Sequence, residues 1–163
     1  MPTIKLTTEI NNTTIEIVFD LIRSIDLHKI SADKSHEEAI AGKTSGLISL
    51  NETVTWRAKH LGFTQELTSK ITAYVFPFFF ADEMVKGAFK SFRHEHYLTQ
   101  KNGKVIVKDV FKYESPFGFL GKLADTLFLE RYMTTFLKER NLVIKNFAES
   151  DKWKKLLEVT SGF

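Results

Sequence analysis

The chain has 163 residues, of which 43% are hydrophobic and 26% charged, the balance of an ordinary globular domain. It contains no cysteine, which excludes disulfides, thiolate metal sites and cysteine nucleophiles. The formal net charge is only +3 and the lysines are scattered among acidic residues, so a nucleic-acid partner is disfavoured. We expect one domain over residues 1–163, with residues 150–163 as a C-terminal extension.

The location in the cell is predicted from what the chain lacks. Its first residues, from Met1 to Lys5, are not a basic segment followed by an apolar stretch. Nowhere do about 18 apolar residues run together, as a membrane span would require. The sequence therefore predicts a cytoplasmic protein with no membrane span, and the absence of cysteine fits a reducing compartment.

The N-terminal part predicts a strand and two helical segments. Residues 3–10 alternate between apolar and polar side chains, which is typical of a half-buried strand. Two asparagines interrupt this pattern, and Thr13-x-x-Glu16 then indicates a capping box at the start of a helix. Apolar residues at helical spacing extend this helix from about Thr14 to Ser24, and a second short helix is expected between Asp26 and Ala32.

The middle of the chain predicts a meander of six strands. From Glu37 to about Ser115 the hydrophobic period is close to two residues. The Asn102-Gly103 pair is the clearest hairpin signal, because both residues tolerate the positive φ values of a tight turn. Turn residues divide the strands at Asn51-Glu52, His60 to Gly62, Pro77, Gly87 and Asn102-Gly103.

One long helix is predicted from Gly118 to about Glu149, because no turn signal interrupts its three- and four-residue apolar spacing. The segment from Leu123 to Leu129 is apolar around much of its circumference, so we expect it to be buried against the sheet. Trp153, Leu156 and Leu157 then indicate a helical extension or a docked tail.

The alternation also assigns a face to each strand residue. In the strand that begins at Val54, Trp56 and His60 point inward together with Ala58. The next strand is expected to point Leu67, Ser69, Ile71, Ala73 and Val75 inward.

Four sequence motifs lie in these predicted strands and the residues that follow them: Val54-Thr55-Trp56-Arg57-Ala58-Lys59-His60-Leu61-Gly62, Phe80-x-Asp82-Glu83-Met84-x-x-Gly87-x-Phe89, His94-Glu95-His96 and Asp109-x-Phe111-x-Tyr113-x-x-Pro116-x-Gly118. With the order of the elements, they resemble the START/Bet v 1-like superfamily (SRPBCC, helix-grip fold), and within it the bacterial ligand-binding or polyketide cyclase-like SRPBCC proteins. The resemblance covers about Thr3 to Glu149. It implies an α+β fold in which a seven-stranded curved antiparallel sheet wraps around the C-terminal helix, with two short helices after the first strand and a pocket inside.

Several titratable side chains are expected on the apolar face of this sheet. His94 and His96 share the inward face of their strand, and Asp109 alternates with Phe111 on the inward face of the next strand. A buried carboxylate without a partner would be costly, and the two histidines are its natural partners.

These residues allow three interpretations. The candidate catalytic residues His94, His96 and Asp109 could perform general acid and base chemistry. The histidine pair could bind a metal if His60 or Asp109 supplied a third ligand, or the group could be a buried polar network that fixes the strand register. Because no third ligand stands at a recognisable spacing and cysteine is absent, we predict no metal site, and we expect no cofactor.

The chain contains 15 phenylalanines, which must fill either a dense core or the wall of an apolar cavity. We favour a cavity between sheet and helix that binds a small hydrophobic or aromatic molecule. For any single aromatic residue, ordinary core packing is the more common explanation, because packed aromatics outnumber pocket walls. The predicted ligand-binding residues are Trp56, His60, Phe80, Phe92, His94, His96, Asp109, Phe111, Tyr113 and Leu127.

Two other functions stay open at this point. One is a polyketide cyclase/aromatase-like enzyme in which His94, His96 or Asp109 transfers protons on a bound poly-β-ketone. The other is a vestigial pocket on a domain whose surface binds another protein. The identity of the ligand, the presence of any catalysis and the formation of a homodimer are likewise open.

Overall fold

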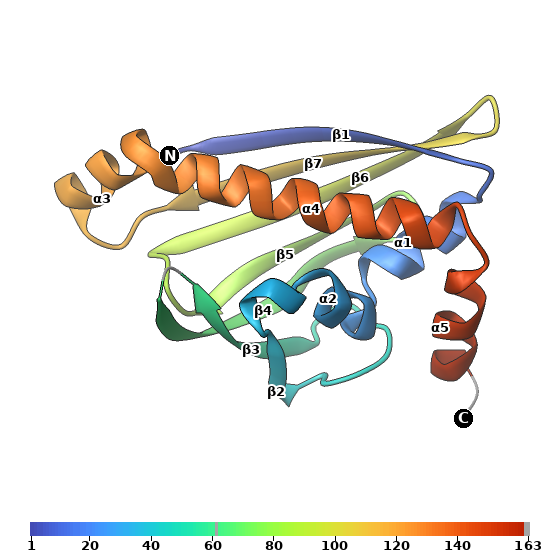
Figure 1. The fold of residues 1–163 in the computed structure, drawn as a ribbon, viewed down its shortest axis with the longest axis horizontal. Helices are drawn as coiled ribbons and strands as arrows, with labels where there is room; N and C mark the ends of the chain where they lie inside the picture. Colours follow the sequence, from blue (N-terminus) through green and yellow to red (C-terminus); the bar gives the residue numbers. More distant parts are fainter. Residues whose placement is uncertain (61, 162–163) are drawn as a thin grey trace.

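A seven-stranded antiparallel sheet wraps around one long helix in the computed structural model (Figure 1), as the sequence predicts. The structure describes residues 1–60 and 62–161, apart from the side chains of residues 119, 124, 125, 127 and 159–161. The strand order is β1-β7-β6-β5-β4-β3-β2. The strands are β1 (Thr3–Asn11), β2 (Glu38–Gly42), β3 (Thr53–His60), β4 (Phe63–Val75), β5 (Phe79–Lys86), β6 (Ser91–Lys101) and β7 (Lys104–Glu114).

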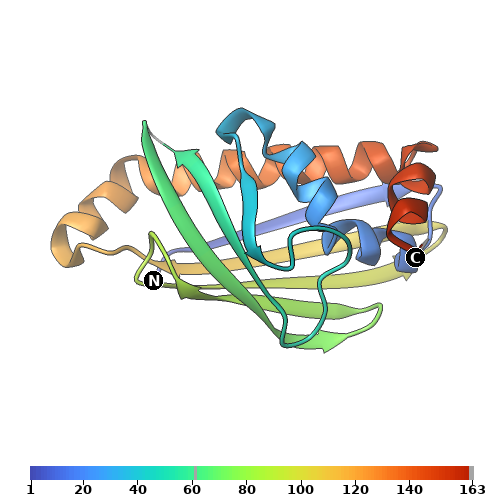
Figure 2. The same cartoon turned by 90° about the horizontal axis from the view of Figure 1, so that it is seen from below.

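The long helix α4 (Glu130–Ala148) and the short helices α1 (Ile15–Ile22) and α2 (Ile25–Ser31) cover the concave face of this sheet, which curves toward α4 (Figure 2). No helix among the described residues has both the length and the apolar character needed to cross a membrane. The helical elements are α1 (Ile15–Ile22), α2 (Ile25–Ser31), the 3-10 turn η1 (Asp33–Ser35), α3 (Gly118–Ala124), the π-helical turn η2 (Asp125–Leu129), α4 (Glu130–Ala148) and α5 (Lys152–Ser161).

Both short helices begin at side-chain caps. The hydroxyl of Thr14 accepts a hydrogen bond from the backbone N–H of Ile17, so the N-cap of α1 lies one residue after the predicted Thr13. The hydroxyl of Ser24 accepts from the N–H of Leu27 and caps α2 in the same way. These caps place α1 and α2 directly one after the other, so that both close the same end of the sheet (Figure 1).

A β-bulge in β4 overturns part of the predicted face assignment. The pairing of β4 with β5 shifts between Ile71 and Ala73, so the alternation is inverted beyond this point. Tyr74 therefore packs against Phe19, with ring centroids 5.3 Å apart, whereas Val75 is exposed instead of pointing inward. The inward prediction fails beyond Ile71 because one extra residue changes the side on which every later side chain lies.

The predicted long helix is divided, and its first part is not buried. The segment α3 and η2 projects beyond the ends of the strands (Figures 1 and 2), where no sheet surface is available to cover it. Leu120 is consequently 69% exposed and Leu123 49% exposed. The expectation that the segment from Leu123 to Leu129 packs against the sheet is wrong for the described side chains Leu123 and Phe128, both of which are exposed.

The buried side chains form two clusters along the inside of the sheet. The larger one joins α1 and α2 to the sheet and includes the fully buried Phe19, and Trp153 and Leu156 of α5 pack against it. The smaller one lies around Phe111 and Leu137, where α4 crosses the other part of the sheet. A cavity is present in addition to these two clusters.

Candidate functional site

The cavity lies between α4 and the concave face of the sheet and has a volume of about 510 Å³. The structure places the following predicted residues in its wall: Trp56, His60, Phe80, Phe92, His94, His96 and Phe111. Asp109 and Tyr113 also point inward and are buried, but they do not line the cavity. The side chain of Leu127 lies outside the described residues.

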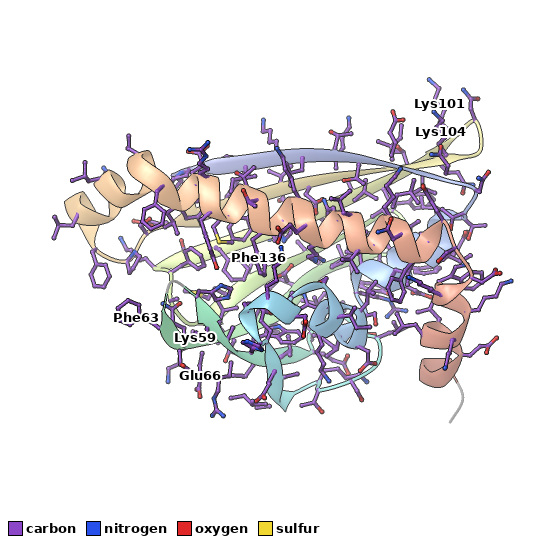
Figure 3. The ribbon with its side chains drawn as sticks, viewed as in Figure 1. Lys59, Phe63, Glu66, Lys101, Lys104 and Phe136 are labelled. Carbon is purple, nitrogen blue, oxygen red and sulfur yellow. The ribbon has the colours of Figure 1, made fainter. Side chains whose placement is uncertain are left out.

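The helix contributes a second wall, which the sequence-based list of ligand-binding residues did not include. Met133, Phe136, Leu137 and Arg140 face the cavity at three- and four-residue spacing, so that they lie along one side of α4. Figure 3 shows Phe136 on the side of α4 turned toward the strands, and its ring lies 5.5 Å from that of His60.

Asp109 lies at the centre of a polar network that we call the Asp109 cluster, defined as Asp82, His94, His96, Asp109 and Asn141. Oδ1 of Asp109 accepts hydrogen bonds from Nε2–H of His94 at 3.0 Å and from Nδ1–H of His96 at 2.8 Å. Its other oxygen, Oδ2, accepts from the side-chain amide of Asn141 on α4 at 2.7 Å. The predicted pairing of the carboxylate with both histidines is thus present in the structure.

The charges in this cluster follow from these bonds. Burial alone would raise the pKa of Asp109, but the hydrogen bonds from His94 and His96 hold it well below its usual range. Burial and the neighbouring His96 lower the pKa of His94 to about 4. Burial opposes the charged form of His96 as well, yet its bonds to Asp109 and Asp82 raise its pKa. The cluster therefore holds an ionised carboxylate beside two histidines of different basicity.

Asp82, within this cluster, and Arg140 are two charged side chains of the cavity wall. Asp82 lies opposite His94 in the pairing of β5 with β6, and its Oδ1 is 3.5 Å from Nε2 of His96. Arg140 on α4 is 8% exposed, and Nη2 donates a hydrogen bond of 3.4 Å to the carbonyl of Ile22. Burial would raise the pKa of Asp82, but the hydrogen bond from His96 and the nearby positive charges lower it.

Asp82, Arg140 and Asn141 are not among the residues predicted for the site from the sequence. The signal for Asp82 was present, since it stands two residues after the inward Phe80 and so shares its face. Arg140 stands at helical spacing from Phe136, which indicates the same side of the helix. No sequence signal distinguishes Asn141.

A second polar network, the Glu37 cluster, comprises His28, Glu37, His60 and Tyr132. Glu37 lies between Nε2 of His28, at 2.6 Å, and Nε2 of His60, at 3.3 Å. Nδ1 of His60 is hydrogen-bonded to the hydroxyl of Tyr132 on α4, at 2.7 Å. Burial alone would raise the pKa of Glu37, but the charge and hydrogen bond of His28 and the bond of His60 lower it to about 2.

The Glu37 cluster joins elements that are far apart in the sequence. His28 comes from α2, Glu37 from the residue before β2, His60 from the end of β3 and Tyr132 from the first turn of α4. All four line the cavity, and the ring of His28 lies 4.3 Å from that of Trp56. Of these four residues only His60 could be predicted from the sequence, because nothing local connects the other three to it.

One group of side chains has the composition of a metal site. The donor atoms of Asp82, His94 and His96 all lie within 4.8 Å of one another. Of the third ligands that the sequence suggested, His60 belongs to the Glu37 cluster and Asp109 accepts hydrogen bonds from both histidines. The third donor beside the histidine pair is Asp82.

No family model matches the chain, and no curated protein matches its sequence. The fold is similar to that of TTHA0849 from Thermus thermophilus, with a TM-score of 0.72 and 13% identity over 89% of this chain and 95% of that one. A START superfamily protein from Mycobacterium smegmatis matches with a TM-score of 0.67 and 7% identity over 90% of this chain and 97% of that one. Ara h 8.0201 matches with a TM-score of 0.65 and 11% identity over 90% and 97%.

Identities this low show the fold and nothing finer. Together with the strand order and the position of α4, they confirm the fold expected from the sequence motifs. The chain has the START/Bet v 1-like helix-grip fold.

Proposed function

We propose that the protein reversibly binds a small apolar or aromatic molecule inside the cavity. The observation that carries this proposal is the cavity itself, whose volume of about 510 Å³ lies in the range of small-molecule sites. Aromatic and aliphatic side chains such as Trp56, Phe92 and Phe136 form much of its wall. Transfer of apolar surface from water into such a site favours binding by roughly 25 cal/mol per Å².

The two polar clusters support a ligand with polar groups on an apolar body. Arg140 and Asp82 present a donor and an acceptor at one part of the wall, and the Glu37 cluster presents His60 and Tyr132 at another. A few fixed polar groups in an apolar wall orient a ligand and select among similar shapes. We infer that binding takes place in the cytoplasm, which the absence of cysteine supports.

A neutral fluorescent probe, N-phenyl-1-naphthylamine, tests this proposal with a matched pair of variants. Ala58 is buried and lines the cavity, whereas Lys59 beside it is exposed on the outer face of β3. Ala58→Trp should fill part of the cavity and weaken probe binding at least tenfold, while Lys59→Trp should bind as wild type does. Melting curves of both variants verify that they are folded. Probe binding that is absent in wild type, or unchanged in folded Ala58→Trp, would contradict the proposal.

A second candidate function is a cyclase/aromatase-like enzyme. The observation that favours it is that His94 and His96 face the cavity while Asp109 holds both rings from behind. A histidine oriented by a carboxylate is a common arrangement for proton transfer. Incubation with a short poly-β-ketone, followed by mass spectrometry for loss of water, tests it. Product formation that disappears in His94→Gln would favour the enzyme, and unchanged substrate would leave ligand binding as the function.

A further inference from the structure

We propose that Asp82, His94 and His96 form a binding site for a divalent first-row transition metal ion, for which Zn²⁺ is the probe. Their donor atoms lie within 4.8 Å of one another, and the two histidines are buried. All three side chains line the cavity, so an ion at this place would be reached from its interior. The proposal does not depend on the binding of an apolar ligand.

The pairing of the strands places the second ring nitrogen of His96 beside Asp82. The histidine pair on β6 stands between Asp109 on β7 and Asp82 on β5. The two nitrogens of an imidazole point away from each other, so a ring of this pair that donates to β7 with one nitrogen cannot direct the other to the same carboxylate. His96 shows this directly, since Nδ1–H donates to Asp109 while Nε2 lies 3.5 Å from Oδ1 of Asp82.

Asp109 provides the outer support that metal-binding histidines have in other proteins. Such histidines almost always donate their second ring N–H to a carboxylate, a carbonyl or water, which sets the ring orientation and the tautomer. Here Oδ1 of Asp109 accepts from both rings, and Asn141 holds Oδ2. The nitrogens that do not donate to Asp109 are Nδ1 of His94 and Nε2 of His96, and Zn²⁺ would displace the proton that Nε2 of His96 directs toward Asp82.

The spacing and the ligand types identify the class of metal. Two ligands at about 2.1 Å from a tetrahedral ion are roughly 3.4 Å apart, close to the 3.5 Å between His96 and Asp82. Two imidazoles and one carboxylate suit zinc or iron(II) and leave positions open for a further ligand. Magnesium and calcium prefer oxygen donors alone.

The charges around the site permit a divalent ion. Asp82 and Asp109 supply two negative charges, and Arg140 in the same wall supplies one positive charge. With a divalent ion, the charges of these three side chains and the ion would sum to +1. A single anionic oxygen bound to the metal would balance this charge. The open coordination positions would therefore favour an oxygen ligand such as hydroxide or a carboxylate.

Isothermal titration of tag-free, EDTA-treated protein with Zn²⁺ tests the site. Wild type should bind about one equivalent, and Mg²⁺ should give no signal. Asp82→Asn and His94→Gln should each weaken Zn²⁺ binding at least tenfold, and Asp109→Asn should weaken it 10- to 100-fold. His60→Gln is the matched control, because His60 also lines the cavity but belongs to the Glu37 cluster, and it should bind as wild type does.

Nitrogen NMR of the imidazole rings tests the site in the wild-type protein, so its result does not depend on whether any variant folds. Zn²⁺ should shift Nδ1 of His94 and Nε2 of His96 and leave the rings of His28 and His60 unchanged. The absence of Zn²⁺ binding by wild type would overturn the proposal. It would equally be overturned if His60→Gln lost as much affinity as Asp82→Asn, or if Zn²⁺ shifted the nitrogens of His28 and His60 instead.

Discussion

Nδ1–H of His96 donates a hydrogen bond of 2.8 Å to Oδ1 of Asp109, directly across the paired strands β6 and β7. Asp109 is only 2% exposed, so its charge depends on this bond and on the donors from His94 and Asn141. A carboxylate that accepts three hydrogen bonds away from water is stable only while its partners stay in place.

Asp109→Asn should therefore destabilise the fold by about 1–3 kcal/mol, because the amide lacks the negative charge and its NH2 group would replace the oxygen that accepts from Asn141. The free energy of unfolding in urea measures this loss. Lys112→Gln, on the exposed face of the same strand, is the control and should stay within about 0.5 kcal/mol of wild type. The double variant with His96→Asn should lose less than the sum of the single losses, and strict additivity would show that the two side chains are not coupled.

The lowered pKa of Glu37 should make the stability of the fold sensitive to acid. Its pKa is lowered from 4.5 to about 2 in the folded protein, so the ionised form stabilises the fold above pH 4.5 and this contribution is lost as the pH falls toward 2. The amount is about 3 kcal/mol. The difference in unfolding free energy between wild type and Glu37→Gln should shrink steadily over this interval. Glu38→Gln, an exposed neighbour, should show no such trend, and a constant difference for Glu37→Gln would refute the assignment.

The hydrogen bond between His60 and Tyr132 ties the first turn of α4 to the end of β3. Tyr132→Phe removes it and should cost about 0.5–1.5 kcal/mol of stability. Hydrogen exchange should become faster for amides in the first turns of α4 and stay unchanged near Ile144. Tyr97→Phe, which removes an exposed hydroxyl bonded to Glu95, should have a smaller effect. Equal exchange in wild type and Tyr132→Phe would mean that the bond does not hold the helix.

Phe117 lines the cavity although it is 75% exposed, which places it where the cavity meets solvent. If the proposed ligand enters there, Phe117→Ser should speed release of the fluorescent probe and change the melting temperature little. Phe63→Ser is the control, because Phe63 is 70% exposed on the β3–β4 hairpin (Figure 3) and does not line the cavity. Stopped flow measures the release rates. If these rates rise equally in both variants, Phe117 is not part of the entrance.

Much of the architecture and three of the five residues of the Asp109 cluster could be predicted from the sequence, because the relevant patterns are local. Asn102 and Gly103 have φ values of 53° and 74°, as the hairpin signal requires, and Lys101 and Lys104 flank the turn (Figure 3). That hairpin sets the pairing of β6 with β7 and so brings His96 opposite Asp109. Side-chain alternation alone then turns both toward the inside.

The remaining parts depended on the tertiary structure. Asp82 meets the histidine pair through the pairing of β5 with β6, and the bulge in β4 turns Tyr74 inward. The Glu37 cluster collects side chains from four elements, because the curvature of the sheet brings the end of β3 against α4. Periodicity determines on which side of its own strand or helix a residue lies. The curvature of the sheet and the rotation of α4 about its axis decide which faces of distant elements come into contact. Both depend on the packing of the whole chain.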